Sequence, residues 1–269
     1  MNEIIIKPVG IVISEIEKPE EMPPGGTPAV IEIYPEYREA LQGIEENSHV
    51  WVLAWFHQAP RDLLKTSPRR VNPDLPEYGV FALRSYGRPN PVALCLAELE
   101  KVEEGRLYLK GLDAIGGTPV IDIKPYFEND IVFSPETSYI KGKTREMRQE
   151  LMMRHAMVHH REQCRDLYLA VRMAVIAEEY FGKVMSAQLG VSVHGSGCLA
   201  DSIQGITRAR LSNPSRFDFK KSENLPRSVW TKEGSTLSIR LKKDFELEEI
   251  KELSEQELFD VEYLPSKNS

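Results

Sequence analysis

Two polar segments of this sequence carry residue types that bind a small charged molecule. In the first, "RSYGRPNP" at residues 84–91, Arg84 and Arg88 flank a Ser-Tyr-Gly turn, and the prolines that follow restrict the loop backbone. In the second, "GLDAIGGTPVIDIK" at residues 111–124, two adjacent glycines allow a close backbone approach beside the hydroxyl of Thr118. The same segment holds three charged side chains near strand ends: Asp113, Asp122 and Lys124. Arginines and carboxylates on neighbouring loops indicate a small-molecule pocket, although they also suit the solvated turns of a β-barrel.

A second group of residues has the types that bind a soft metal ion. His160 and Cys164 are four residues apart in a segment of helical composition, so on a helix they would share one face. With the distant Cys198 they could form a site for zinc or iron, and Glu162 or Asp201 could be a further ligand or a partner of a ligand. Because no Cys-x-x-Cys pair is present, buried free thiols are the competing interpretation.

The elements that must position the first group are short strands. Strand-like runs closed by Gly, Pro, Asn or Asp occur at residues 4–13, 29–34, 48–56, 79–83, 91–102, 105–112 and 118–126. Little room for helices remains between them, apart from a short one at residues 37–41, so we expect a small antiparallel barrel or sandwich over residues 1–140. The long loop at residues 58–78, rich in Pro and Arg, is expected near a site or an interface.

The pattern changes at about residue 141, which predicts a domain boundary there. Residues 144–181 are helical in composition, with apolar residues three and four apart and Gly182 placed as a C-terminal cap. A strand over 187–194, a helix over 199–207 and strands over 227–231 and 235–241 then give an α+β domain over residues 141–269. Ser254 and Glu257 form a capping-box signature for a last short helix before a polar tail. The expected fold class is therefore mixed: an N-terminal barrel and a C-terminal α+β domain.

Composition narrows the classes of function. The chain has 269 residues with 34 basic and 41 acidic side chains, and this formal net charge of −7 argues against binding nucleic acid mainly by phosphate neutralisation. The apolar runs are of strand length and no basic segment precedes an apolar core at the start, so neither a membrane span nor a signal peptide is expected. Three cysteines suit reduced thiols or a metal site, and a cytoplasmic location is expected.

The strings "FALRS", "RPNP", "GLD", "GTP" and "DIKPY" resemble the TsaA-like family, also called TrmO, of S-adenosylmethionine-dependent tRNA methyltransferases. The resemblance spans most of residues 8–130 and implies a small β-barrel that works as a homodimer, with the methyl donor near the arginine and "DIKPY" loops. No Gly-rich Rossmann turn is present, so the donor is inferred from the resemblance alone. The family usually has Thr and Asp where this chain has Leu83 and Gly116, and Ser where it has Cys95. A C-terminal Asp-Pro-Arg-Pro-type motif of bacterial members is not evident. These departures bear mainly on the choice of acceptor.

S-adenosylmethionine carries a sulfonium cation and a carboxylate, and a pocket for it needs a charge-assisted donor and nearby acceptors. Arg84 or Arg88 can supply the first, and Asp113 or Asp122 the second. The predicted donor-binding residues are Arg84, Ser85, Arg88, Asn90, Pro91, Asp113, Thr118 and Lys124. The side chains that could accept the proton of the methylated nucleophile are Asp122, Tyr126 and His57.

The second half resembles the FmdE family, small domains associated with formylmethanofuran dehydrogenase and often metal-binding. His160 and Cys164 match the first His and the Cys of the family's His-Gly-His-x-Cys stretch, whereas Glu162 replaces its second His. Cys198, Asp201 and Gln204 match its Cys-x-x-Asp-Ala-Ile-Gln stretch. The predicted metal ligands are His160, Cys164 and Cys198, for zinc or iron.

The resemblance to the TsaA-like family implies methylation of the exocyclic amine, N6, of threonylcarbamoyladenosine in tRNA. One alternative is methylation of a small molecule, a thiol or other soft nucleophile held or activated by a metal in the second domain. Another is a non-catalytic sensor of S-adenosylmethionine or of a metal. Transfer of label from the donor to tRNA, to metabolites or to neither distinguishes the three.

Overall fold

The computed structural model describes residues 4–266 and divides the chain into two compact units. The first holds the residues up to Ser67 together with Glu77–Ile131, and the second holds Pro68–Pro76 together with the residues from Val132 onward. Each unit has its own hydrophobic core. The boundary therefore lies nine residues before the expected one, because the chain leaves the barrel at Ile131, and the tip of the predicted long loop is part of the second unit.

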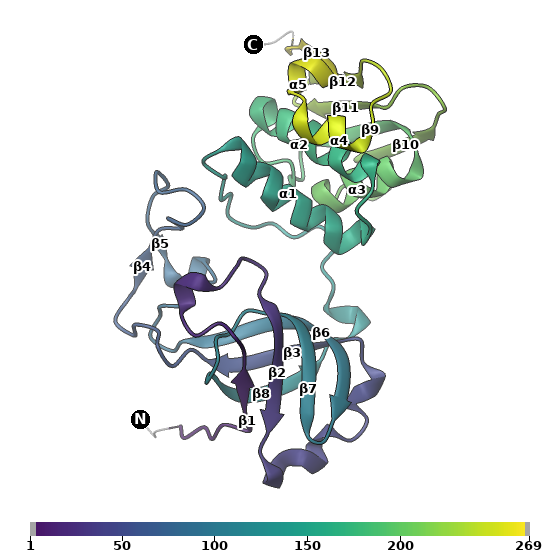
Figure 1. Ribbon diagram of the computed structural model, residues 1–269. Helices are drawn as coiled ribbons and strands as arrows, with labels where there is room; N and C mark the ends of the chain where they lie inside the picture. Colours follow the sequence, from purple (N-terminus) through teal and green to yellow (C-terminus); the bar gives the residue numbers. More distant parts are fainter. Residues whose placement is uncertain (1–3, 267–269) are drawn as a thin grey trace. The chain divides into compact units, whose positions relative to one another are not determined.

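The first unit is a closed antiparallel barrel with strand order β1-β2-β7-β6-β3-β8 (Figure 1). Its strands are β1 (Gly10–Ile13), β2 (Thr27–Ile33), β3 (His49–Trp55), β6 (Val92–Glu103), β7 (Arg106–Leu112) and β8 (Pro119–Pro125). Two short strands, β4 (Lys65–Thr66) and β5 (Tyr78–Gly79), pair outside the barrel. The predicted N-terminal barrel is confirmed.

Alternation of inward-facing and outward-facing side chains along the strands explains why this sequence closes into a barrel. In β3, Val50, Val52 and Ala54 are fully buried, and in β6, Ala93, Cys95 and Ala97 point inward opposite them. Successive side chains of a strand face opposite sides, so small and β-branched residues fill the narrow interior. The alternate residues of β6, Val92, Leu94 and Leu96, are instead exposed on the outside of the barrel.

Short 3₁₀ helices connect these strands: η1 (Pro19–Glu21), η2 (Pro35–Leu41), η3 (Ile44–Glu46), η4 (Val80–Ala82) and η5 (Glu128–Asp130). Helix η2 covers the short helix expected at residues 37–41. The strand expected at residues 79–83 is wrong, because only Gly79 lies in a strand and η4 follows it. Residues 80–83 are a continuous apolar run with no alternation of apolar and polar residues, so this segment has no strand period. In the structure Val80 is buried and the adjacent Phe81 is 84% exposed.

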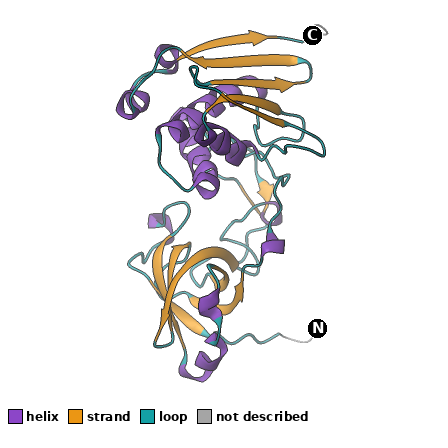
Figure 2. Ribbon diagram, turned by 90° about the vertical axis from the view of Figure 1, so that its right-hand side faces the viewer, coloured by secondary structure: helices purple, strands orange, loops and turns teal. Residues whose placement is uncertain are grey.

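The second unit is an α+β domain, as predicted. Helices α1 (Arg145–His160), α2 (Arg165–Phe181) and α3 (Gly197–Thr207) cover one face of a five-stranded sheet (Figure 2), and α4 (Leu247–Glu252) and α5 (Glu255–Leu258) are short. The sheet order is β10-β9-β11-β12-β13. Its strands are β9 (Gly190–Gly195), β10 (Phe217–Lys221), β11 (Arg227–Lys232), β12 (Ser235–Leu241) and β13 (Phe259–Leu264).

Several local expectations for this unit hold, and others need correction. The segment 144–181 is two helices, because Arg161 ends α1 in the left-handed conformation and Cys164 begins α2. The Ser254–Glu257 capping box is present and starts α5. Strand β13 occupies part of the expected polar tail, because it pairs with β12 at the sheet edge. No helix among the described residues is long and apolar enough to cross a membrane.

Candidate functional site

The barrel topology gathers most of the predicted donor-site residues at one rim. Trp55 at the end of β3 pairs with Val92 at the start of β6, and Ala54 pairs with Val120 near the start of β8. The ends of β3 and β7 and the starts of β6 and β8 thus lie at the same end of the barrel. The predicted residues in the connections at this rim are His57, Arg84, Ser85, Arg88, Asn90, Pro91, Asp113 and Thr118.

An open pocket of about 510 Å³ lies at this rim, a volume that suits a small molecule. It is lined by Val12, Ile13, Ser14, Glu17, Gln58, Gly116 and Gly117. Gly117 has a φ of +76°, which favours glycine, and a Cβ on Gly116 would lie 3.0 Å from the backbone oxygen of Ser14. The adjacent Thr118 is fully buried, and its Oγ1 has no hydrogen-bond partner among the described residues. The Gly116–Gly117 turn thus presents backbone to the pocket, while the Thr118 hydroxyl is buried behind it.

Three polar residues of this pocket, Ser14, Glu17 and Gln58, were not predicted. They follow β1 and β3 in segments whose composition is that of ordinary turns. Only the closure of the barrel, which pairs β1 with β8, brings Ser14 beside Gly116.

Arg88 holds the arginine loop together. Its Nε donates to the Ser85 carbonyl at 2.8 Å, and its Nη2 donates to the carbonyls of Val80 at 3.1 Å and Leu83 at 2.6 Å. The backbone N–H of Arg88 also donates to Pro60 O at 3.1 Å, which fixes the loop to the segment after β3. Arg88 thus acts on the loop backbone, while Arg84 is exposed at the rim.

Arg84 and Asp113 lie near the same buried thiol. Burial is the main cause that raises the pKa of Cys95 to about 11; the Asp113 carboxylate adds to the effect, and the Arg84 guanidinium opposes it. Cys95 Sγ also donates to the backbone oxygen of Asp113 at 3.5 Å. The two predicted loops, of opposite charge, are therefore neighbours at the start of β6.

Lys124 and Tyr126 lie toward the far end of β8, and Asp122 lies in the middle of this strand. Strand β8 runs from Pro119 to Pro125, and at about 3.3 Å per residue Tyr126 lies roughly 25 Å along the chain from Thr118. Asp122 and Lys124 pair with each other at 2.6 Å, with Lys124 exposed and Asp122 half-buried. The Tyr126 ring contacts Trp51 with a centroid separation of 5.8 Å. The structure therefore does not bring these three residues to the pocket within one barrel. Their predicted role at the donor site stays a prediction; strand β8 runs away from the pocket, so none of the three lines it.

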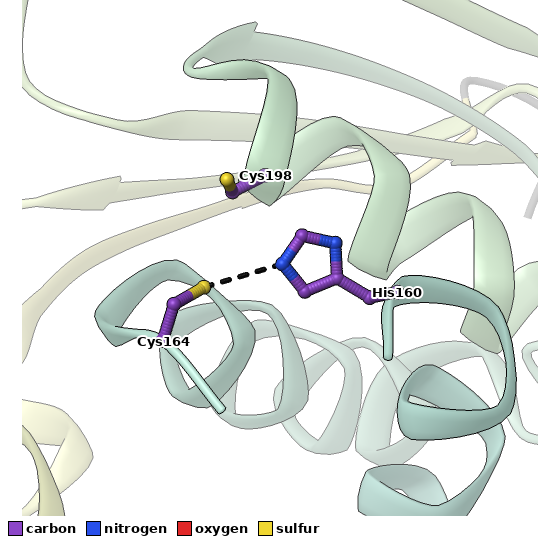
Figure 3. Close-up of side chains that lie close together, drawn as sticks. All are labelled: His160, Cys164 and Cys198. Carbon is purple, nitrogen blue, oxygen red and sulfur yellow. Dashed lines mark hydrogen bonds between the residues drawn. The ribbon is translucent and has the colours of Figure 1, made fainter. Parts of the chain in front are cut away.

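The three predicted metal ligands do converge (Figure 3). His160 is the last residue of α1, Cys164 is the N-cap of α2, and Cys198 lies in the first turn of α3. The ligand atoms of all three lie within 4.8 Å of one another, and His160 Nε2 lies 3.3 Å from Cys164 Sγ. Two thiols and an imidazole are a donor set for zinc or another soft cation. The residues present therefore fit the predicted ion.

The surroundings of this cluster, defined as His160, Cys164 and Cys198, are polar and acidic. Asp201 Oδ2 lies 2.8 Å from His160 Nδ1. Burial is the main cause that raises the pKa of the Cys198 thiol, followed by Cys164, Asp166 and Glu162. Negative neighbours and partial burial disfavour a lone thiolate there.

Fold and pocket together define a closed antiparallel β-barrel with an open pocket of small-molecule size at one rim. Residues 12–130 match the family described as the tRNA-methyltransferase O N-terminal domain, and the chain belongs to this family. The match covers the barrel and every predicted donor-site residue. The resemblance predicted from the N-terminal motifs is thereby confirmed.

Relatives extend this result. A Methanothermobacter thermautotrophicus protein named "Probable S-adenosyl-L-methionine-binding protein" is 45% identical over 131 residues, which is 47% of this chain and 93% of that protein. An Archaeoglobus fulgidus protein of the same name is 34% identical over 226 residues, 80% of this chain and 61% of that protein. This second alignment is longer than the barrel, so it continues into the α+β unit. The Mus musculus "tRNA (adenine(37)-N6)-methyltransferase" is 42% identical over 120 residues, 44% of this chain and 27% of that protein.

Proposed function

We propose that this protein transfers a methyl group from S-adenosylmethionine, bound in the rim pocket, to N6 of threonylcarbamoyladenosine in tRNA. The observation that carries the proposal is the family match over residues 12–130, which contains the rim loops and every residue that lines the pocket. The name of the mouse relative supports an adenine in tRNA as the acceptor. The threonylcarbamoyl group is the finer part of the proposal and rests on the resemblance of the motifs.

The bound donor supplies an electrophilic methyl group on sulfur, and the protein's task is to orient it. Arg84, exposed at the rim, offers a guanidinium to a carboxylate. Glu17 and Gln58 line the pocket and offer acceptors to cationic and amine groups. The backbone of the Gly116–Gly117 turn provides further polar contacts. Holding donor and nucleophile in line contributes much of the acceleration of a displacement.

A nitrogen nucleophile must also lose a proton. Of the three predicted acceptors, His57 is the one at the pocket rim, adjacent to the lining residue Gln58, whose Nε2 lies 3.5 Å from His57 Nε2. We therefore assign the proton acceptor to His57, acting directly or through water.

The acceptor is tested with labelled S-adenosylmethionine and two tRNA pools, one prepared with and one without threonylcarbamoyladenosine. Label should enter only the first pool, at N6 of the modified adenosine. Label in both pools would overturn the assignment of the threonylcarbamoyl group, and label in neither pool, with donor binding intact, would favour a sensor. His57→Gln should retain donor affinity and lose transfer; loss of both would reassign His57 to donor binding.

The outer face of β3 and β6 supports the homodimer that the resemblance implies. Across these strands Trp51 faces Leu96, Leu53 faces Leu94, and Trp55 faces Val92. The three β6 residues are 37–49% exposed, which makes a contiguous apolar face on the barrel. Such a face suits a self-complementary interface between two copies. Leu94→Lys should convert a dimer seen by light scattering to a monomer, whereas a monomeric wild type would refute this interface.

A second candidate function rests on the His160–Cys164–Cys198 cluster. We propose that it holds zinc or iron, in keeping with the resemblance of this half to the FmdE family, and that the α+β unit helps to select the acceptor. A bound divalent cation would keep a thiol ionised at neutral pH, so a small-molecule thiol is the alternative methyl acceptor. Elemental analysis of protein purified without a metal-affinity tag should find about one ion per chain. Absence of stoichiometric metal would remove this candidate, and transfer of label to a thiol in a metabolite extract would favour it over tRNA.

A further inference from the structure

Asp201 contacts both histidines at the end of α1. Its Oδ2 lies 2.8 Å from Nδ1 of His160, and its Oδ1 lies 3.0 Å from Nε2 of His159. One carboxylate therefore engages two adjacent imidazoles through different ring nitrogens. A carboxylate accepts hydrogen bonds only, so each of these nitrogens carries a proton.

This arrangement makes the two histidines unequal. With its proton on Nδ1, His160 presents an unprotonated Nε2 to the cluster, where Cys164 Sγ lies 3.3 Å away and can donate its S–H. His159 has its Nε2 engaged by Asp201, and it is not among the residues that converge. The two neighbouring histidines thus differ in which ring nitrogen the shared carboxylate engages.

The position of Asp201 on α3 explains why its carboxylate can reach the His160 ring. Asp201 lies three residues after Cys198 on α3, so the two side chains lie on neighbouring positions of the same helix face. The His160 side chain is only 7% exposed, whereas that of Asp201 is 43% exposed. The buried ring is therefore oriented from the solvent side by a carboxylate that lies outside the converging set.

We infer that Asp201 is a positioning residue that fixes the ring and tautomer of His160 so that Nε2 faces the cluster. The effect of Asp201 on metal binding rests on the proposed metal function. The orientation of the His160 ring is a property of the metal-free protein. Hydrogen-bonded carboxylates that orient ligating histidines typically change metal affinity by about 10–100-fold when they are removed. Asp201 is then not a ligand, which decides between the two roles that the sequence left open.

The test combines two readouts on the full chain. Ring ¹⁵N chemical shifts of the metal-free protein report the tautomer of His160, and competition with a chromophoric chelator reports the affinity for Zn²⁺. The wild type should carry its proton on Nδ1. Asp201→Ala should lose this preference and bind Zn²⁺ about 10–100-fold more weakly. Asp201→Asn, which keeps an acceptor oxygen, should retain the tautomer and bind with intermediate affinity.

Glu162→Gln is the matched control, because it removes one negative charge near Cys198 without removing a partner of His160. It should leave the tautomer of His160 unchanged and the Zn²⁺ affinity within about threefold of the wild type. This margin is well below the roughly 10–100-fold effect expected for Asp201→Ala. An unchanged tautomer in Asp201→Ala would overturn the inference, as would equal losses of affinity in Glu162→Gln and Asp201→Ala. If the wild type takes up no Zn²⁺ while Asp201→Ala alters the tautomer, the orienting role stands and the metal proposal fails.

Discussion

Arg84 and Arg88 have the same charge, but the structure gives their guanidinium groups different surroundings. Arg88 donates three hydrogen bonds to carbonyls of its own loop, whereas Arg84 is exposed beside the rim. Residue type and spacing alone could not separate these roles, because either side chain can hold a carboxylate. The separation depends on the loop conformation at residues 80–88, which directs the carbonyls of Val80, Leu83 and Ser85 toward the Arg88 guanidinium.

Replacing each arginine should therefore have a different effect. Arg84→Ala should weaken donor binding by about 1–3 kcal/mol and leave barrel stability unchanged, since only a charge-assisted contact with the ligand is lost. Arg88→Ala should lower both stability and donor affinity, because three backbone carbonyls lose their donor. Titration calorimetry with S-adenosylmethionine and denaturant unfolding measure the two effects. A stability loss in Arg84→Ala equal to that in Arg88→Ala would contradict the assignment.

Glu178 is a buried carboxyl group whose titration affects stability. Burial raises its pKa above the ordinary value, and the nearby Tyr139 hydroxyl and Arg148 guanidinium oppose this only in part. Its Oε2 has no hydrogen-bond partner among the described residues, since Arg148 Nη1 is 3.9 Å away. The folded state therefore holds the Glu178 proton more tightly than the unfolded state.

The sign of the pH dependence follows from linkage. A raised folded-state pKa contributes stability that is complete below the unfolded pKa and is lost as pH rises through the folded value. Glu178→Gln stays neutral, so its stability relative to the wild type should increase as pH rises from about 4 to 7. Denaturant unfolding at a series of pH values measures this difference. A difference that shrinks with rising pH would show that ion pairing to Arg148 outweighs burial.

At the scale of elements, one glycine sets how closely α3 approaches α1. A Cβ on Gly205 would lie 2.6 Å from the Cβ of His159, a distance that real structures essentially never show. The two helices carry His160 on one side and Cys198 with Asp201 on the other, so their separation also sets the geometry of the cluster. The position is a helix-interior glycine that the apolar periodicity does not explain.

Gly205→Ala should separate these helices. We expect a loss of about 1–3 kcal/mol in unfolding free energy from overpacking, together with weaker Zn²⁺ binding. Gly197→Ala, on the same helix but with nothing within 4 Å of the added Cβ, is the control and should leave stability unchanged within about 0.5 kcal/mol. Denaturant unfolding and chelator competition measure both variants. Equal effects in the two variants would point to a general effect of Gly-to-Ala replacement in α3.

At the scale of the whole molecule, the chain folds into two units with separate cores. The barrel core holds residues such as Ile31, Val52 and Leu107, and the second core holds residues such as Leu169 and Trp230. The chain passes between the units after Ser67, after Pro76 and after Ile131. Within the second unit, the loop segment Pro68–Pro76 is tied to the residues before α1 by a backbone hydrogen bond from Lys143 N to Val71 O at 3.2 Å.

Separate cores predict separate responses to ligands. A ligand that binds only the folded state at 100 times its dissociation constant stabilises it by about 2.7 kcal/mol. Zn²⁺ should therefore increase hydrogen-exchange protection in α2 and α3 and leave β3 and β6 unaffected, whereas S-adenosylmethionine should protect the barrel alone. Exchange measured by mass spectrometry on peptides from both units tests this. Equal protection of both units by either ligand would show that they unfold as one.

The sequence by itself determined the elements and the ligand types of both sites. Alternation of apolar and polar residues specified the barrel strands and the rim motifs identified the family, because both are local patterns of side-chain chemistry. The expected single helix face for His160 and Cys164 is wrong, since α1 ends at His160 and Cys164 begins α2. Closure of the barrel decided the rest. It placed His57 and Thr118 at one rim with Ser14, Glu17 and Gln58, and Tyr126 at the other. Packing of α1, α2 and α3 likewise brought Cys198 to the cluster and placed Asp201 in contact with His159 and His160. These contacts join residues far apart along the chain, and only tertiary pairing, which no local pattern encodes, determines which of them meet.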